Sequence, residues 1–435
     1  MKLYEIRDPI HGFIVLNDWE RELIGHPAFQ RLRRIRQLGW TDVVYPGAMH
    51  TRFEHSLGVM HVATRMFDEI QTRRRPLLES ELQYTEAGLE RDRVLVRLAA
   101  LLHDVGHAPF SHAAEALMTK SSDTQKPYRH EDYSAAIVTH LMRDVIEGHP
   151  LNQNYQIKAE DIADFLKGSP RLGRSLLWRS LISSQLDADR ADYLLRDSYH
   201  IGVEYGRYDL NRLLVTMTVT VDSEGAPVLA VEDGGMHAAE GLILARYMMF
   251  TQVYFHHTRR AYDQHLADAM RQLLAARQSN NKSPACAVFP PPTGLENVQQ
   301  YVDWTDWRVL GMVDDGMAGD HGIILKQRRH HRMVYQTPEA PQQADLDLVV
   351  QISDALGESI GFIDKAESSW YRFGSTDIPI LMSPGSAREN LTCLSELSSV
   401  VRGLKAVSQR RIYVPYDRKD EARKTVDGLC KIKGT

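Results

Sequence analysis

Apolar residues recur at spacings of three and four through most of residues 1–275, which is the periodicity of amphipathic α-helices. The pattern is clearest over Val94–Val105, Ser134–Ile146 and Ala238–Gln252. Strand-like alternation of apolar and polar residues is clearest at Tyr4–Leu16 and Leu214–Val231. The sequence therefore predicts a mainly α fold for this part of the chain, with two short strand or hairpin segments.

The character of the chain changes near residue 278, where polar residues and four prolines follow one another in RQSNNKSPACAVFPPPTG. We expect a domain boundary there, between a helical core at residues 1–277 and a smaller α+β region at residues 278–435. In the second region the expected strands are Gly322–Leu325, Leu346–Ile352 and Arg411–Val414, and the expected helix is Arg418–Leu429. We interpret this region as a candidate regulatory or oligomerisation lobe.

Composition argues against several classes of protein. The 435 residues carry a net charge of −5 with a pI near 6.4, which argues against a chain that coats nucleic acid through bulk positive charge. The basic clusters Arg73–Pro76 and Gln327–Met333, interpreted as exposed surface, leave weak binding of single-stranded nucleic acid open. Cys286, Cys393 and Cys430 have neither disulfide nor metal-ligand spacing, and no apolar run reaches the roughly 18 residues that span a bilayer. The sequence therefore predicts a cytoplasmic protein with no membrane partner.

Histidines are concentrated early in the chain, with seven of the 19 between residues 50 and 130. In LAALLHDVGHAPFSHAAE, His103 and Asp104 are adjacent on a predicted helix, His107 follows one turn later, and Pro109 ends the helix. Adjacent helical residues diverge by about 100°, which is close to the angle between neighbouring ligands of a six-coordinate ion. An isolated His-Asp pair is nevertheless more often a capping pair or a buried hydrogen bond, so its surroundings decide its meaning.

Two further blocks supply candidate ligands for the same ion. His55 lies at the start of an amphipathic helix in RFEHSLGVMHVA, and Asp189 lies in SSQLDADRADYLLRD. Together with His103 and Asp104 they form a mixed nitrogen and oxygen set that suits Fe, Mn, Co, Ni or Zn better than Ca.

With these residues in this order, the sequence resembles the HD-domain superfamily. Within it, the sequence is similar to the deoxynucleoside triphosphate (dNTP) triphosphohydrolases, which include bacterial dGTPase-like enzymes and the vertebrate SAM-and-HD-domain enzyme. The matching segments are DPIHGFI, FQRLRRIRQLG, YPGAMHTRFEHSLGV, LLHDVGHAPFSH, HED, DADRADYLLRDSYHIG and RRAY. The resemblance implies an HD-domain helical core and hydrolysis of a dNTP to deoxynucleoside and triphosphate.

By this resemblance, the metal ligands are His55, His103, Asp104 and Asp189. A metal at that position makes a bound water easier to deprotonate, and this water attacks the α-phosphorus. We expect Mg or Mn to accompany the phosphates of the substrate.

The resemblance also implies a catalytic set of His107, His112, Glu115 and His130. We expect His112 to donate the proton that the leaving 5′ oxygen requires, and His130 to contact a phosphate oxygen. Glu115 follows His112 by one helical turn and is expected to orient it. Outside the matched blocks, such histidines are more often ordinary surface or core residues.

Arg52 and Arg190 match positions that contact phosphate, with Arg190 in place of the lysine of some relatives. In the same helix as Arg190, we interpret Asp192 and Arg196 as an i,i+4 ion pair with no further role.

A further set matches the sugar end of the pocket. A tyrosine against the ribose ring leaves little room for a 2′-hydroxyl, which is a physical route to selectivity for deoxynucleotides. For one member, Leu38, ordinary helix packing explains the residue equally well. The set is Gln37, Leu38, Tyr193, Asp197 and Tyr262.

Gln30 and Arg33 match an allosteric nucleotide site at a subunit interface in the vertebrate relative. We therefore expect a homo-oligomer, and both an activating dNTP and no nucleotide effector stay open. Gly25 stands where that relative has the aspartate that reads guanine, which argues against activation by GTP. A solvated basic helix face explains the arginines of FQRLRRIRQ equally well.

Two other functions stay open at this point. The same metal site suits hydrolysis of another phosphoester, such as a nucleoside monophosphate, a cyclic nucleotide or a guanosine alarmone. A nucleic-acid-binding regulator that has kept an HD-like fold without turnover is the alternative outside the enzymes. The presence of every metal ligand and of all three active-site histidines argues against the regulator.

Overall fold

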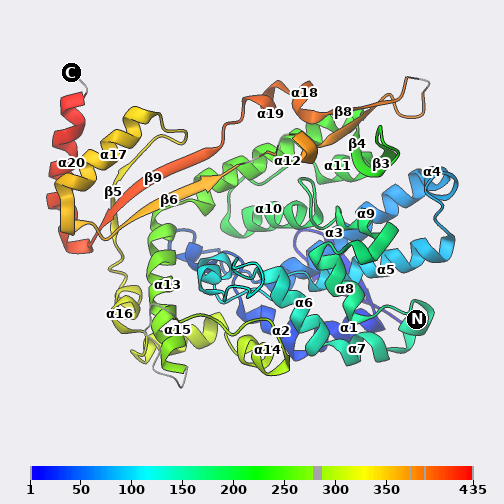
Figure 1. The fold of residues 1–435 in the computed structure, drawn as a ribbon, viewed down its shortest axis with the longest axis horizontal. Coiled ribbons are helices and arrows are strands. Elements are labelled where there is room, and N and C mark those ends of the chain that lie inside the picture. The colour runs from blue at the N-terminus through cyan, green and yellow to red at the C-terminus, as the bar shows by residue number, and fades with distance from the viewer. Residues whose placement is uncertain (1, 278–286, 370, 373, 387, 434–435) are drawn as a thin grey trace.

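The computed structural model is mostly helical, and the predicted mainly α fold is confirmed (Figure 1). A smaller part at the left and top of Figure 1 mixes strands with helices, as predicted for the C-terminal region. The predicted boundary at residues 278–286, with Cys286, lies outside the residues that the structure describes. The described residues are 2–277, 287–369, 371–372, 374–386 and 388–433.

Three helices at the centre of the body are α3 (Arg52–Arg73), α5 (Glu86–Leu102) and α10 (Ala188–Ile201). Helix α3 packs against both of the others. Helix α10 begins where the Asp187 side chain accepts a hydrogen bond from the Arg190 backbone N–H at 2.8 Å. It ends at Gly202, whose φ of +73° provides the left-handed residue that commonly terminates a helix.

The predicted helices are present, although two of them are interrupted. Val94–Val105 lies largely within α5, Ser134–Ile146 is divided at Leu141 between α6 and α7, and Ala238–Gln252 runs from α12 into a π-helix. The other helices before residue 278 are α1 (Asp18–Gly25), α2 (Pro27–Gln30), α4 (Arg75–Ser80), α6 (His130–His140), α7 (Arg143–Gly148), α8 (Ala159–Lys167), α9 (Leu176–Arg179), α11 (Leu210–Thr216), α12 (Met236–Met249), the π-helix Phe250–Tyr254 and α13 (His257–Arg277).

Both predicted hairpins form. Strands β1 (Leu3–Asp8) and β2 (Gly12–Asn17) pair antiparallel, with Leu3 opposite Asn17. Strands β3 (Met217–Val221) and β4 (Pro227–Glu232) form the second hairpin, and the start of that predicted segment belongs to α11 instead.

The C-terminal region contributes to two sheets. Strands β7 (Pro379–Met382) and β8 (Asn390–Cys393) extend the β3–β4 hairpin to the order β3-β4-β7-β8, with β4 and β7 parallel. Strands β5 (Arg332–Gln336), β9 (Val407–Val414) and β6 (Phe362–Ser368) form an antiparallel sheet in that order, so the strand predicted at Arg411–Val414 is confirmed. The helices of this region are α14 (Leu295–Val302), α15 (Asp306–Asp314), α16 (Gly319–Gln327), α17 (Gln343–Leu356), α18 (Leu394–Leu397), α19 (Ser399–Gly403) and α20 (Lys419–Lys433).

Two strand predictions in this region are wrong. Gly322–Leu325 lies inside α16 and Leu346–Ile352 lies inside α17. In α17 the buried residues Val349, Ile352 and Leu356 are spaced by three and four, so the helix buries one face against β9 and α20. Short apolar runs fit a buried strand and a helix equally well, and here the flanking polar residues extend the helical pattern.

One continuous apolar core joins β2, the helices of the body and the C-terminal helices α14 and α15. A second, smaller core lies between α17, α20 and β9. His330, which we predicted to lie on the surface, is buried, because its ring packs on Tyr262 with the centroids 4.6 Å apart. Among the described residues, no helix is long and apolar enough to cross a membrane.

Candidate active site

The His-Asp pair lies in a turn at the end of α5. The helix stops at Leu102, so our prediction that it continues through His107 to Pro109 is wrong. The His103 ring explains the early end, because its Nδ1 donates to the Ala100 carbonyl at 2.8 Å within the last turn. Gly106 then packs so tightly on α6 that a Cβ atom there would collide with the backbone. The pair is therefore presented from a rigid turn and not from a helix face.

Four side chains from three elements converge beside this turn. His55 Nε2 lies 3.0 Å from Asp189 Oδ1 and 3.6 Å from Asp104 Oδ2. His103 Nε2 lies 3.3 Å from Asp104 Oδ1 and 3.8 Å from Asp189 Oδ1. Ligands at right angles about 2.1 Å from one ion are about 3.0 Å apart, so the spacing of these atoms suits a single divalent cation.

Two further observations fit a cation at this position. His103 Nε2 is buried and has no hydrogen-bond partner among the described residues, so its lone pair faces the two carboxylates. Burial opposes a charge on His55, yet hydrogen bonds to Asp189 and Asp192 raise its pKa to about 10. The carboxylates therefore favour positive charge between them. The ligand atoms of His55, His103 and Asp104 all lie close enough to one another to hold a divalent metal.

Asp192 has a role that our sequence analysis missed. The predicted ion pair with Arg196 is present and fully buried. In addition, Asp192 Oδ2 accepts a hydrogen bond from His55 Nδ1 at 2.8 Å. A carboxylate on the far nitrogen of a ligating histidine fixes the orientation and tautomer of its ring. The spacing of Asp189 and Asp192 by three residues on one helix was the available signal, since both then face α3.

A second cluster surrounds Glu115, on the 3₁₀-helix Ser111–Leu117. Glu115 Oε1 lies 3.0 Å from His112 Nδ1 and 2.8 Å from His130 Nδ1. His107 stacks on His130 with ring centroids 3.9 Å apart, and its Nε2 reaches Asp104 Oδ1 at 3.2 Å. The imidazole of His107 therefore joins this cluster to the candidate metal site.

Charge is distributed unevenly in this second cluster. Burial would raise the pKa of Glu115, but His112 and His130 hold it well below its usual range. Burial opposes protonation of His130, while its hydrogen bond to Glu115 raises its pKa to about 9. Burial, together with the charges of Arg52 and His130, holds the pKa of His107 well below its ordinary value. At neutral pH the cluster thus combines a cationic His130 with a neutral His107.

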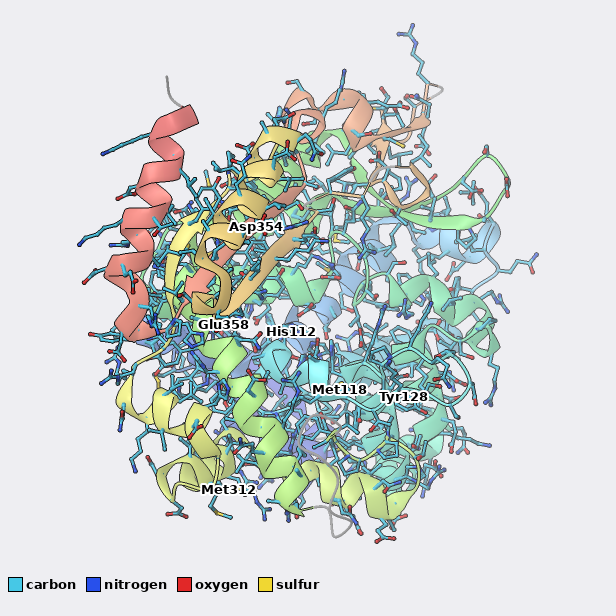
Figure 2. The ribbon with its side chains drawn as sticks, turned by 60° about the vertical axis from the view of Figure 1, so that its left-hand side comes forward. His112, Met118, Tyr128, Met312, Asp354 and Glu358 are labelled. Atoms are coloured by element: carbon cyan, nitrogen blue, oxygen red, sulfur yellow. The ribbon has the colours of Figure 1, made fainter. Side chains whose placement is uncertain are left out.

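His112 is the accessible member of the cluster, with 61% of its side chain exposed. It is labelled near the centre of the view in Figure 2. The preceding residue pair, Phe110 and Ser111, adopts positive φ values of +55° and +59°. Asp306 of α15 holds this turn by accepting the Phe110 backbone N–H at 2.7 Å. The C-terminal region thus fixes the loop that presents His112.

The two predicted phosphate-contacting arginines both lie at the site. Arg52 pairs with Asp104 and donates from Nε to Ser111 Oγ at 2.8 Å. Arg190 pairs with Asp187 and donates to the Ser184 carbonyl. Both guanidinium groups are thereby held at the rim of one cavity.

This cavity has a volume of about 210 Å³. Most of the predicted site residues line it, together with several residues that belong to no recognisable motif. Arg179 is one of the latter, and it is fixed there by donating to the carbonyls of Phe165 and Leu166 at 3.0 and 3.2 Å. A larger cavity of about 470 Å³ between α9, β4 and β7 contains none of the predicted site residues. The lining residues of the smaller cavity are Gln37, Arg52, His103, Asp104, His107, His112, His130, Glu131, Phe165, Leu166, Arg179, Ile182, Ser183, Asp187, Asp189, Arg190 and Tyr193.

Of the predicted sugar-end residues, Gln37 and Tyr193 line the cavity, and Leu38, Asp197 and Tyr262 do not. Leu38 is buried in the apolar core, so the alternative of helix packing describes its position in this structure.

The other two sugar-end residues are also buried. Asp197 is engaged elsewhere, accepting from His50 Nε2 at 2.7 Å and from the Tyr254 hydroxyl at 2.6 Å. Tyr262 packs against Trp40, and its hydroxyl has no hydrogen-bond partner among the described residues.

The predicted effector residues lie away from the cavity. Gln30 donates to the Ile24 carbonyl at 2.7 Å, and Arg33 donates to Gln30 Oε1 at 3.0 Å. The Arg33 guanidinium also stacks over Phe53, 3.5 Å from the ring centroid.

Comparison with known families and proteins gives consistent matches. Residues 52–197 match the HD domain model, and residues 208–285 match a model described as an HD associated region. The uncharacterized protein YwfO of Bacillus subtilis is 30% identical over 98% of this chain and 95% of its own length. The deoxynucleoside triphosphate triphosphohydrolase SAMHD1 of Bos taurus is 34% identical over 74% of this chain, which spans about half (56%) of that protein.

Solved structures agree with this assignment. A hypothetical protein from Aquifex aeolicus superposes with a TM-score of 0.76 at 28% identity, over 98% of this chain and all of its own. A phosphohydrolase from Bacteroides thetaiotaomicron has the same fold, with a TM-score of 0.69 at 24% identity over 95% of this chain and all of its own. The chain therefore belongs to the HD-domain superfamily, with an HD domain followed by an HD-associated region.

Proposed function

We propose that this chain is a dNTP triphosphohydrolase that releases a deoxynucleoside and intact triphosphate. The observation that carries the proposal is the convergence of His55, His103, Asp104 and Asp189. All of these but the buried His55 line a cavity that Arg52 and Arg190 also line. The similarity to SAMHD1 supports the choice of substrate.

The four converging residues would hold the metal, with Fe, Mn, Co, Ni and Zn as candidates for this donor set. The bound ion supplies Lewis acidity and positive charge for attack on a phosphoryl group. Mg or Mn would accompany the phosphates of the substrate. All other contributions to the reaction come from the side chains around the cavity.

The cationic side chains of the cavity bind the triphosphate of the substrate. Arg52 and Arg190 are fixed by carboxylates, so their positions are set before the substrate arrives. Protonated His130 adds a third positive charge and contacts a phosphate oxygen. Burial raises the pKa of Tyr193 to about 12, so its ring stays neutral where the sugar would lie.

His112 donates the proton to the departing 5′ oxygen in this proposal. Its Nδ1 is held by Glu115, so its Nε2 is free to face the substrate. Exposure to solvent allows the proton to be replaced after each turnover.

Product analysis tests the reaction directly. Purified, metal-loaded protein is incubated with each dNTP and rNTP, singly and in pairs, and the first phosphate-containing product is identified by ion-exchange chromatography. We expect inorganic triphosphate together with a deoxynucleoside. Orthophosphate or pyrophosphate as the first product would instead indicate another HD phosphohydrolase. Hydrolysis that appears only when two nucleotides are supplied together would support a nucleotide effector. We propose that such an effector acts on a homo-oligomer of this chain.

The Glu115→Gln variant tests the charge of the second cluster. Because the raised pKa of His130 depends on Glu115, the wild-type rate is expected to fall as the pH rises through about 9, where His130 loses its proton. In the variant, burial without the compensating carboxylate lowers that pKa, so the fall should begin at lower pH. Profiles of kcat against pH for both proteins give the answer. Identical alkaline limbs would show that Glu115 does not set the protonation of His112 and His130, the two histidines that it contacts.

A further inference from the structure

The loop between β1 and β2 reaches the centre of the molecule. Asp8 Oδ1 accepts the backbone N–H groups of Ile10 and His11 at 2.9 Å, which fixes the loop. Gly12 closes it with a φ of +79°. The other oxygen of Asp8 accepts from Arg196 Nη1 at 2.8 Å, so the loop is attached to α10.

From this loop His11 contacts the carboxylate that supports a metal ligand. His11 Nε2 donates to Asp192 Oδ1 at 2.6 Å, and His55 Nδ1 donates to Asp192 Oδ2 at 2.8 Å. Arg196 completes the carboxylate, with one 2.8 Å hydrogen bond to each oxygen. The side chains of His11, His55 and Asp192 are all buried.

These contacts determine how the His55 ring is oriented. With Nδ1 held by Asp192 at 2.8 Å, its Nε2 faces Asp189 at 3.0 Å and Asp104 at 3.6 Å. The nitrogen that would bind the metal therefore points at the two carboxylate ligands from α10 and the α5 turn because Asp192 holds the opposite nitrogen.

Gly58 of α3 provides a second, independent observation. It lies in the interior of α3, one turn after His55, where glycine is less favourable than alanine. A Cβ atom at this position would collide with the Asp192 carboxylate and the Arg196 guanidinium. The helix thus has a glycine at the point where the buried ion pair approaches it.

We propose that His11 is a positioning residue for the metal ligand His55, acting through Asp192, so that the β1–β2 loop is part of the metal centre. This rests on the metal site of the proposed function, and it does not depend on which nucleotide is hydrolysed. Without the His11 hydrogen bond, Asp192 Oδ1 is held by Arg196 alone, so the carboxylate holds the His55 ring less firmly in its orientation.

The test uses Co²⁺ as the probe, without nucleotide. His11→Leu removes the donor, and His11→Gln keeps an N–H at a similar reach. We expect His11→Leu to weaken Co²⁺ binding by about 10- to 100-fold and to change the visible absorption of bound Co²⁺. His11→Gln should restore most of both. Phe13→Ala changes an exposed residue of the same hairpin and should leave both unchanged.

Thermal unfolding of the metal-free variants separates positioning from general destabilisation, because a purely structural residue would lower the Tm without altering the spectrum. Gly58→Ala should displace the Asp192 carboxylate from α3 and weaken Co²⁺ binding in the same way. Wild-type affinity and spectrum in His11→Leu would overturn the proposal, and so would a His11→Gln variant as impaired as His11→Leu. If wild type binds Co²⁺ as expected but hydrolyses no dNTP, only the proposed function fails.

Discussion

Replacement of Asp189 by alanine is expected to abolish stoichiometric metal binding and to slow dNTP hydrolysis by on the order of 10³-fold or more. The reason is that a catalytic metal lowers the activation barrier by several kcal/mol. Asp189 Oδ1 lies 3.0 Å from His55 Nε2 and 3.8 Å from His103 Nε2, so its loss opens one side of the site. Metal content by mass spectrometry and the rate of triphosphate release are measured on the same preparation.

Glu90→Ala serves as the matched control. Glu90 is an exposed carboxylate on α5, the helix that leads to His103, and it lies outside the cavity. The control should keep one metal per protomer and the wild-type rate. An Asp189→Ala protein that also keeps both would remove this residue from the metal site.

Replacement of His112 by alanine is expected to lower kcat by about 10²- to 10⁴-fold, which is the usual contribution of a general acid. The metal content and the KM should change little, because the side chain is exposed and does not contact the candidate metal ligands. The variant should also fold normally for the same reason. Steady-state kinetics at saturating dNTP, with metal analysis, measure both quantities.

Added imidazole gives a positive control for the role of His112, since it can enter an open cavity and supply the missing proton donor. His140→Ala, at an exposed position in α6, controls for the loss of a histidine. If His112→Ala keeps the wild-type kcat, or loses its metal together with its activity, His112 is not the proton donor.

The sequence predicted the parts of the site that follow the order of motifs. His55, His103, Asp104 and Asp189 come together in the structure, and Glu115 contacts His112. The contact between Glu115 and His130 was not predicted. Residues that act through spatial neighbours were harder to find. The hydrogen bond between His11 and Asp192 joins positions 181 residues apart, and no local spacing indicates it.

Other differences between the predicted site and the structure also have physical causes. An i,i+4 pair such as Asp192 and Arg196 looks the same in sequence whether it is exposed or buried, so the pair itself did not indicate the connection to His55. The spacing of Asp189 and Asp192 by three residues was the only sequence signal that we identify for it. Motif matches give the order of residues along the chain but not the directions of their side chains. They therefore did not indicate that Asp197 and Tyr262 lie outside the cavity lining. Arg179 reaches the cavity from a short helix without any motif, through hydrogen bonds to carbonyl groups at the end of α8.

The most direct test of the account is the position of the metal itself. Crystals of the Co²⁺-loaded protein, measured at the cobalt absorption edge, would give an anomalous difference map. We predict a peak about 2.0–2.2 Å from His55 Nε2, His103 Nε2 and the carboxylates of Asp104 and Asp189. A fully loaded protein with its peak among His107, His112, His130 and Glu115 instead, or with those four predicted ligands pointing apart, would contradict the account.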